Sequence, residues 1–247
     1  GARPKATVID GEDSWIAKFA SASDRGNPAI RNEALALDLA QRAGVRTVDA
    51  RLTTAAGRDA LLVRRFDRGG AGARLMAVSG LTMLQLDEMV GRYATYPALL
   101  DVLRDLGDRP EGVGEELFTR IAANVALGNT DDHARNHAAL WNGQRLTLSP
   151  AFDIDPCRTP GWDASQAMAY GRDGQRTSNL AGLIDVSATY DLARAEASAI
   201  VDRVVTTIRD SWTDAVERAG LTRDQASVLY GSRILNESTL ADLPRLS

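Results

Sequence analysis

The sequence predicts an α+β fold of two lobes, a small β-rich N-lobe over residues 1–68 and a mainly helical C-lobe over residues 69–247. The first 70 residues alternate short β-rich runs with turn signals and contain one amphipathic helix, whereas helical periodicity dominates from Thr82 onward. The 247 residues are 44% hydrophobic and 25% charged, which is an ordinary globular composition. The chain is therefore long enough to bury a large core.

Turn chemistry defines the elements of the N-lobe. Asp10-Gly11 and Ala56-Gly57 each separate two β-rich runs and predict antiparallel hairpins. Asn27-Pro28 opens a helix that runs to about residue 43, where Gly44 ends it. The glycine-rich residues 69–72 are the natural hinge between the lobes. The predicted strands are 7–9, 15–19, 45–53 and 59–66.

The C-lobe is predicted from helical periodicity and one hairpin. Asn142-Gly143, the strongest short-range turn signal, separates strands expected at 138–141 and 145–148. A loop-rich stretch is expected around 157–179. The predicted helices lie near 82–90, 97–106, 112–127, 190–219 and 222–235.

The chemistry concentrates around this hairpin. Four residues separate Asp131 from Asn136, which is the D-x-x-x-x-N spacing of a kinase catalytic loop, where the carboxylate serves the attacking hydroxyl and the amide binds Mg²⁺. The hairpin returns Asp153 to the neighbourhood of Asn136, so these two residues could share a metal that bridges nucleotide phosphates. Asp155 is a competing ligand.

Lys18 and Glu33 are the candidates for phosphate contact in the N-lobe. Lys18 lies on the second predicted strand and Glu33 on the helix that follows. Kinases have the same order of elements, in which a strand lysine binds phosphates and pairs with a glutamate of the next helix. A lone lysine on a strand is more often simply solvated. The segment Gly1-Ala2-Arg3-Pro4-Lys5 is a small-residue loop with two cations ahead of a strand, and it could lie over triphosphate oxygens through backbone N–H groups and Lys5.

The end of the last N-lobe strand, Leu61 to Arg68, is where a nucleotide base could meet exposed backbone groups. The alternative is a solvated strand end, with Phe66 in the core and Asp67 paired to Arg65 or Arg68.

Other site chemistries fit poorly. His133 and His137 form H-x-x-x-H, but a zincin needs Glu immediately after the first His and Ala134 stands there, so we prefer His133 as a phosphate-facing donor. The P-loop pattern, the G-x-G-x-x-G pattern and the G-x-S-x-G elbow are absent from the sequence. Cys157, the single cysteine, is expected to be an inert packed thiol.

Charge and composition limit which partners and which cellular compartment we expect for the protein. A net charge of −4 and a pI near 5.3 give no electrostatic footprint for direct nucleic-acid binding. One cysteine makes an intramolecular disulfide impossible and indicates a reducing, cytoplasmic compartment, while no apolar stretch approaches the roughly 20 residues that cross a bilayer. The chain begins at Gly1 without a leader pattern, which suggests a segment of a longer protein.

Five motifs follow one another along the chain: GARPK at 1–5, WIAKF at 15–19, LLVRRFDR at 61–68, GNTDDHARNH at 128–137 and LSPAFDIDP at 148–156. In sequence and in order they resemble the motifs of the HipA-type serine/threonine kinases, the toxin components of bacterial toxin–antitoxin pairs. The resemblance covers Gly1 to about Pro156, and the helical remainder is compatible with it.

This resemblance implies a bilobal, protein-kinase-like fold that binds ATP and Mg²⁺ in the cleft between the lobes. Carried over to this sequence, it makes Asp131 the catalytic aspartate and Asn136 and Asp153 the magnesium ligands. The remaining nucleotide contacts implied are the phosphate-contacting Lys18 and His133, the adenine-facing backbone of Arg64 and Phe66, Asp67 near the ribose, and the phosphate-side loop with Gly1, Ala2 and Lys5.

The resemblance also implies a protein hydroxyl as substrate, with aminoacyl-tRNA synthetases among the family's targets, and a cognate antitoxin through which alone DNA would be contacted. It further implies regulation by autophosphorylation of a serine just before the G-x-x-P-K segment, a position ahead of Gly1. Two rival functions are a non-catalytic module that binds the antitoxin or a target, and a metal-dependent phosphohydrolase. The hydrolase would use a cluster of Asp131, Asp132, His133, Asp153 and Asp155.

Overall fold

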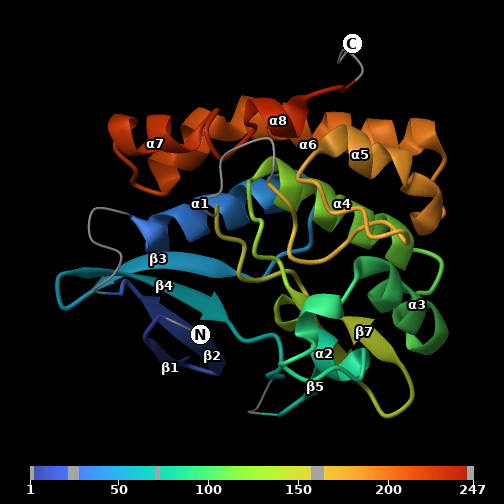
Figure 1. Ribbon diagram of the computed structural model, residues 1–247. Helices are drawn as coiled ribbons and strands as arrows, with labels where there is room; N and C mark the ends of the chain where they lie inside the picture. The colour runs from blue at the N-terminus through green and yellow to red at the C-terminus, as the bar shows by residue number, and fades with distance from the viewer. Residues whose placement is uncertain (1–2, 22–27, 70–72, 157–163, 244–247) are drawn as a thin grey trace.

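The computed structural model describes residues 3–21, 28–69, 73–156 and 164–243. Its N-lobe sheet has the strand order β1-β2-β4-β3, and all neighbouring strands are antiparallel (Figure 1). Both predicted hairpins are confirmed. At the second turn Ala56 and Gly57 have φ of 49° and 74°, the left-handed backbone that tight hairpins require. The strands are β1 Lys5–Asp10, β2 Asp13–Phe19, β3 Ala50–Ala55 and β4 Arg58–Arg64.

The strand predicted at 45–53 begins later, at residue 50, because the preceding residues leave the sheet. Thr47 instead forms a parallel bridge with Ala151, which lies more than 100 residues further along the chain. Two main-chain bonds support the bridge: Val48 donates to the Ala151 carbonyl (3.0 Å), and Ala151 donates to that of Arg46 (2.7 Å).

Helix α1, Ala29–Arg42, is the one helix among the described residues of the N-lobe. It lies between the sheet, where it contacts β3 and β4, and the long helix α6, Arg194–Arg218 (Figure 1). Because neighbours cover it from two sides, most of its residues are buried. The predicted end at Gly44 is confirmed: Gly44 has φ 96°, and Val45 donates its N–H back to the Ala40 carbonyl (3.0 Å).

The C-lobe is mainly helical, as predicted, and α4 and α6 form its centre. One hydrophobic cluster runs from α1 through α4 to α6, so the core is continuous across the predicted boundary at residue 68, which itself stays a prediction. No helix among the described residues combines the length and apolar character that a membrane crossing requires. The other C-lobe α-helices are α3 Tyr96–Leu106, α4 Val113–Ala126, α5 Leu180–Asp185, α7 Arg223–Leu229 and α8 Glu237–Leu240.

The helix predicted at 82–90 is wrong. The chain forms only a single turn, α2 Gly80–Met83, and a 3₁₀ turn, η3 Gly91–Tyr93. Gln85 takes the left-handed conformation with φ 54°, which ends α2. The Asp87 carboxylate then accepts the N–H groups of residues 89 and 90, a local turn that competes with helical bonding. Helix α7 is also shorter than the predicted 222–235.

A second sheet carries the predicted hairpin. Its strands β6 Ala138–Trp141 and β7 Leu146–Leu148 confirm the Asn142-Gly143 turn, and β5 Met76–Ser79, which the sequence did not reveal, pairs with β6. Residues 129–137 lead into β6 and residues 149–155 leave β7. We call these two segments the catalytic loop and the metal loop after their predicted roles.

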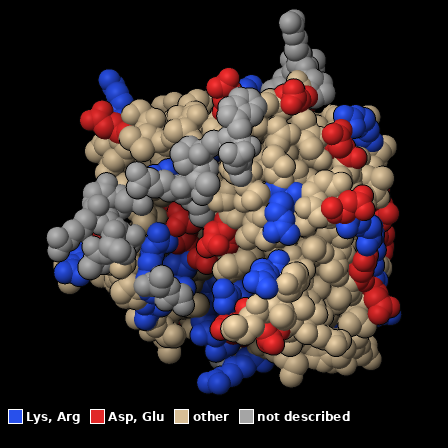
Figure 2. Space-filling model, in the orientation of Figure 1, with Lys and Arg blue, Asp and Glu red and all other residues tan. Residues whose placement is uncertain are grey.

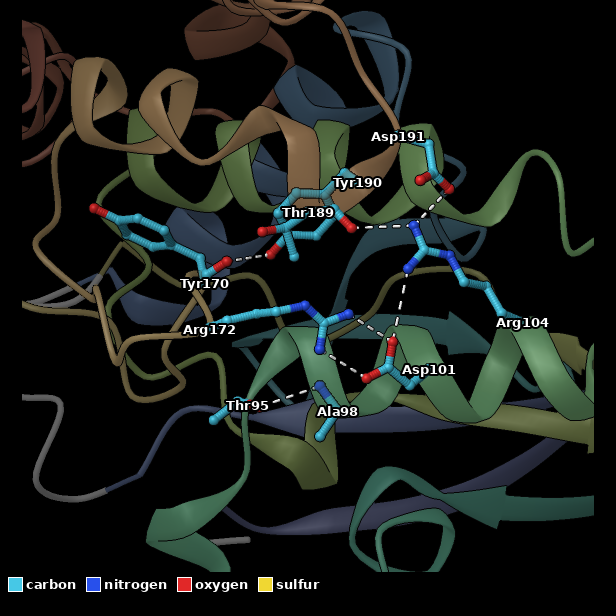
Figure 3. A network of polar contacts seen from close by, with 9 residues as sticks. All are labelled: Thr95, Ala98, Asp101, Arg104, Tyr170, Arg172, Thr189, Tyr190 and Asp191. Atoms are coloured by element: carbon cyan, nitrogen blue, oxygen red, sulfur yellow. Dashed lines mark hydrogen bonds and ion pairs between the residues drawn. The ribbon is translucent and has the colours of Figure 1, made fainter.

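An ion-pair network fixes the segment that follows the metal loop (Figure 3). Arg172 donates two hydrogen bonds to Asp101 of α3 (2.9 and 2.8 Å), and Arg104 of α3 contacts Asp191 (2.5 Å). Tyr190 donates its hydroxyl to the Tyr170 carbonyl (2.7 Å). Helix α3 therefore holds residues 170–191. Residues 70–72 of the expected hinge and residues 157–163 lie outside the described residues.

Candidate active site

Lys18 joins the two lobes at the centre of the site. It lies on β2, is only 7% exposed, and its Nζ donates to a carboxylate oxygen of Glu33 on α1 and to Oδ1 of Asp153 in the metal loop (2.5 Å). Burial lowers the pKa of Lys18, but the charges of Glu33 and Asp153 outweigh burial and raise it overall. The ammonium is therefore a fixed positive charge, and the solvated alternative for this lysine does not apply.

Glu33 is the buried ion-pair partner of Lys18. Its side chain has no solvent exposure, and burial raises its pKa more than the Lys18 charge lowers it. The pairing with Lys18 is the arrangement that the order of strand and helix indicated at the level of sequence.

Among the carboxylates of Glu33, Asp153 and Asp155, that of Asp153 is the most exposed to solvent. Its side chain keeps 40% of its surface exposed, and its backbone takes the left-handed conformation with φ 61°. Burial acts to raise the pKa of Asp153, but Lys18, and to a smaller extent Lys5 and His133, lower it overall. Asp153 is thus ionised, and Lys5 of the first strand and His133 of the catalytic loop both lie within its electrostatic reach.

Asp155 stands apart from Asp153 in its contacts. Its Oδ2 accepts a hydrogen bond from Arg3 Nη1 (2.9 Å), and burial raises its pKa despite this cation. The side chain of Asp153 is also the more exposed of the two (40% against 26%), so we keep Asp153 as the expected metal ligand.

The catalytic loop presents Asp131 to solvent while Asn136 is nearly buried. The Asn136 amide Nδ2 lies 3.4 Å from the Asp131 carbonyl oxygen. His133 is partly buried, and its Nδ1 atom has no hydrogen-bond partner among the described residues. A buried imidazole nitrogen without a partner is suited to meet a ligand oxygen.

The residues present fit Mg²⁺ and a nucleotide phosphate chain. The ionised Asp153 and the amide oxygen of Asn136 are hard oxygen donors of the kind Mg²⁺ prefers, and Mg²⁺ commonly takes only one or two protein ligands beside phosphate oxygens. Figure 2 shows the matching charge distribution: carboxylate side chains lie in a hollow with Lys and Arg side chains beside and below it. Such a surface can hold both a cation and the phosphates that the cation bridges.

The hydrolase cluster is not assembled. Asp132 is 3% exposed, and its Oδ2 already accepts bonds from three side chains. Within the described ranges, no group of three or more His, Cys, Asp and Glu side chains could hold a metal ion.

The residues expected near adenine and the ribose differ in the contacts that they make. Phe66 packs against Phe152 of the metal loop, with ring centroids 5.5 Å apart. Asp67 forms ion pairs with Arg65 and Arg68 (both 2.6 Å), which was the alternative for this residue. Arg64 is exposed and contacts Asp13 (2.6 Å), Gly1 and Ala2 lie outside the described residues, and all these nucleotide roles stay predictions.

Known proteins resemble this chain in sequence and in fold. The family model described as HipA-like C-terminal domain matches residues 1–212 of the chain. The chain belongs to this family. A curated relative from Sinorhizobium fredii (strain NBRC 101917 / NGR234), named "Putative kinase Y4mE", is 27% identical over 197 residues, which are 76% of this HipA-like chain and 46% of the relative. The chain thus spans about half the length of that relative.

Two solved structures show that the HipA-like chain has a kinase-like fold. HipA of Shewanella oneidensis MR-1, solved with HipB and its operator DNA, superposes with a TM-score of 0.76 at 18% identity, covering 93% of this chain and 61% of HipA. The Helicobacter pylori proinflammatory kinase CtkA superposes with a TM-score of 0.57 at 12% identity, covering 93% of each chain. The bilobal, kinase-like fold expected from the sequence is confirmed.

Sequence reasoning missed Arg120, which anchors the metal loop of this HipA-like chain. Arg120 lies on α4, is 2% exposed, and donates from Nη2 to the Ser149 carbonyl (2.5 Å) and to Glu116 (2.6 Å). A buried arginine needs such partners, because an unpaired buried charge is expensive. The signal in the sequence was one cation inside the apolar run LFTRIAANVA, which a surface-facing helix position would also produce.

Proposed function

We propose that this HipA-like chain is an ATP- and Mg²⁺-dependent protein kinase that phosphorylates a serine or threonine hydroxyl. One observation supports this most directly: Lys18 of β2 contacts both Glu33 of α1 and Asp153 of the metal loop. A strand lysine that contacts both a helix glutamate and a metal-loop aspartate joins the parts of a kinase that must come together for phosphoryl transfer. The kinase-like family and fold support the same reaction class.

Each residue has a defined task in this reaction. Bound Mg²⁺-ATP would supply the transferable phosphoryl group and partly neutralise its charge. Lys18 would bind phosphate oxygens, and Asn136 and Asp153 would hold the cation. Asp131, exposed on the catalytic loop, would orient the acceptor hydroxyl and accept its proton. Because little covalent help is needed, positioning and charge neutralisation would supply most of the rate enhancement.

Replacing the base tests this function. The protein and ATP are incubated with a cell lysate, and mass spectrometry searches for new phosphoserine and phosphothreonine sites, aminoacyl-tRNA synthetases included. Asp131→Asn should abolish these sites and leave ATP binding, measured by calorimetry, largely intact. The matched control is Asp173→Asn, which removes an exposed carboxylate outside the site. Equal transfer by Asp131→Asn and wild type would show that the role assignment is wrong.

We also propose an antitoxin partner and a role in growth arrest. Support comes from the HipA neighbour, which was solved with HipB and operator DNA. The acidic net charge of −4 favours DNA contact through the antitoxin alone. A gel-shift assay with operator DNA should show no shift with this chain alone and a supershift when a HipB-like protein is added. An ATP-dependent kinase acts where ATP is plentiful, so we propose the cytoplasm as its compartment.

A further inference from the structure

Asp132, the residue after the candidate base, is the centre of a buried polar cluster. Its Oδ2 accepts hydrogen bonds from the Tyr96 hydroxyl of α3, from Asn124 Nδ2 of α4 (2.6 Å) and from His137 Nε2 (3.1 Å). Tyr96, Asn124, Asp132 and His137 are each at most 4% exposed. We call these four residues the Asp132 cluster.

Burial of an ionised carboxylate costs free energy, and hydrogen-bond donors around Asp132 offset this cost. An ionised carboxylate only accepts hydrogen bonds, so three donors converge on one oxygen. The His137 and Tyr96 rings meet in a T-shaped arrangement at a centroid distance of 5.4 Å and an interplanar angle of 79°. Asn129 Nδ2 donates to Asn124 Oδ1 (2.9 Å), which orients the amide so that its nitrogen faces Asp132. Among the described residues, His137 Nδ1 is the one buried polar side-chain atom of the cluster without a partner, and the hydrogen bonds of the other side chains favour a single arrangement.

The position of the cluster in the chain gives it a specific effect. Asp132 follows Asp131 directly, and His137 follows Asn136 directly. The contact between Asp132 and His137 therefore joins the residue after Asp131 to the last residue of the catalytic loop, and it closes the stretch that contains Asn136. The His137 carbonyl also accepts the N–H of Gly80 (2.7 Å), which fixes this C-terminal end of the loop to α2.

We propose that the Asp132 cluster positions the catalytic loop, fixing the separation and orientation of Asp131 and Asn136 through α3 and α4. Tyr96, Asn124, Asp132 and His137 are positioning residues, since they act through the loop and contact no reacting atom. The inference rests on the proposed kinase function for its kinetic consequence. Its structural consequence, the rigidity of the loop, is independent of that function.

Two tyrosines provide a matched test. Tyr96→Phe removes a buried hydroxyl that bonds the catalytic loop, whereas Tyr190→Phe removes an equally buried hydroxyl that bonds the Tyr170 carbonyl (2.7 Å) away from the loop. Both variants lose one buried hydrogen bond and should lose thermal stability, Tyr96→Phe more than Tyr190→Phe because its bond goes to a charged carboxylate. Only Tyr96→Phe should speed amide hydrogen exchange in peptides covering residues 130–137.

The kinetic result should separate the variants in the same way. We expect Tyr96→Phe to lower kcat about tenfold or more with the KM for ATP unchanged, because small displacements of catalytic groups are costly. Asp132→Asn, which keeps the volume and loses the charge, should act likewise and serves if Tyr96→Phe folds poorly. Equal exchange and equal kcat in Tyr96→Phe and Tyr190→Phe would overturn the inference. Absence of transfer by the wild type would instead reject the kinase proposal, and the exchange comparison would still decide the positioning role.

Discussion

Glu33 of α1, which has no contact with solvent, shares the Lys18 ammonium with Asp153 of the metal loop. The three side chains come from the sheet, the helix and the segment after the second hairpin. One ammonium thus bonds two carboxylates whose positions in the sequence are 120 residues apart. The stability of the N-lobe and the position of a candidate metal ligand therefore depend on the same charge.

Removing that charge should destabilise the protein. Lys18→Met leaves Glu33 buried without a cation, and breaking a buried pair in this way typically costs about 3–5 kcal/mol. In Lys18→Met/Glu33→Leu both charged groups are replaced by apolar ones, and most of the loss should be recovered. Urea denaturation of the three proteins measures the free energy of unfolding. A double variant less stable than the single one would contradict the expected energetics.

The destabilisation by Lys18→Met should depend on pH. Burial raises the pKa of Glu33, and without Lys18 nothing comparable lowers it. A carboxyl group whose folded pKa exceeds its unfolded value of about 4.3 binds more protons in the folded state, so stability falls as pH rises between the two values. Lys18→Met should therefore be less stable relative to wild type at pH 8 than at pH 5. The double variant, which lacks the carboxyl group, should show no such trend.

Asp153→Asn should separate folding from metal binding. Asparagine tolerates the left-handed backbone at this position nearly as well as aspartate does, so the loop should keep its conformation. The amide is a weaker Mg²⁺ ligand than the carboxylate, and the gain in ATP affinity on adding Mg²⁺ should shrink or vanish. Calorimetric titration of ATP with and without Mg²⁺ measures this. An unchanged gain would exclude Asp153 as a metal ligand and would point to Asp155.

Gly80→Ala should impair the catalytic loop specifically. A Cβ at Gly80 would overlap the carbonyl oxygen of Ala134 in the loop, and a Cβ at Gly114 would overlap that of Tyr190, away from the site. Both variants should lose about 1–3 kcal/mol of stability, since backbone atoms must shift. Only Gly80→Ala should also lose phosphate transfer in assays run well below both melting temperatures. Equal activity of the two variants would show that α2 does not support the loop.

The sequence predicted those elements whose ends are set by local chemistry. The turns at Asp10-Gly11, Ala56-Gly57 and Asn142-Gly143 all form, because left-handed backbone there is decided by the turn residues themselves. The helix expected at 82–90 does not form, and its cause is also local but cannot be recognised from the sequence pattern. Its periodicity was helical, but Gln85 adopts left-handed backbone and Asp87 captures the neighbouring N–H groups.

The sequence likewise predicted one part of the candidate site and not another. The sequence placed Lys18 on a strand and Glu33 on a helix, and the structure brings both to Asp153. The spacing to Asn136 selected Asp131 as the catalytic residue, but it gave Asp132 no role beyond the rival hydrolase cluster. Only tertiary packing shows that the first faces solvent and the second lies in a buried cluster. Arg120 was missed for the same reason, since burial of a cation depends on what covers the helix.

Helix α1 is held between the sheet and α6, with Ile30, Leu35 and Leu39 at most 1% exposed. Some kinases are regulated by movement of the corresponding helix, which makes or breaks the lysine–glutamate pair. Here an outward swing of Glu33 would pull these side chains out of a core shared by both lobes, at a cost of about 1.5–3 kcal/mol for each large side chain exposed. For the proposed kinase, the lysine–glutamate pair is therefore already assembled, and movement of α1 offers no inexpensive off state. We expect control of activity to come from whatever blocks access to the site.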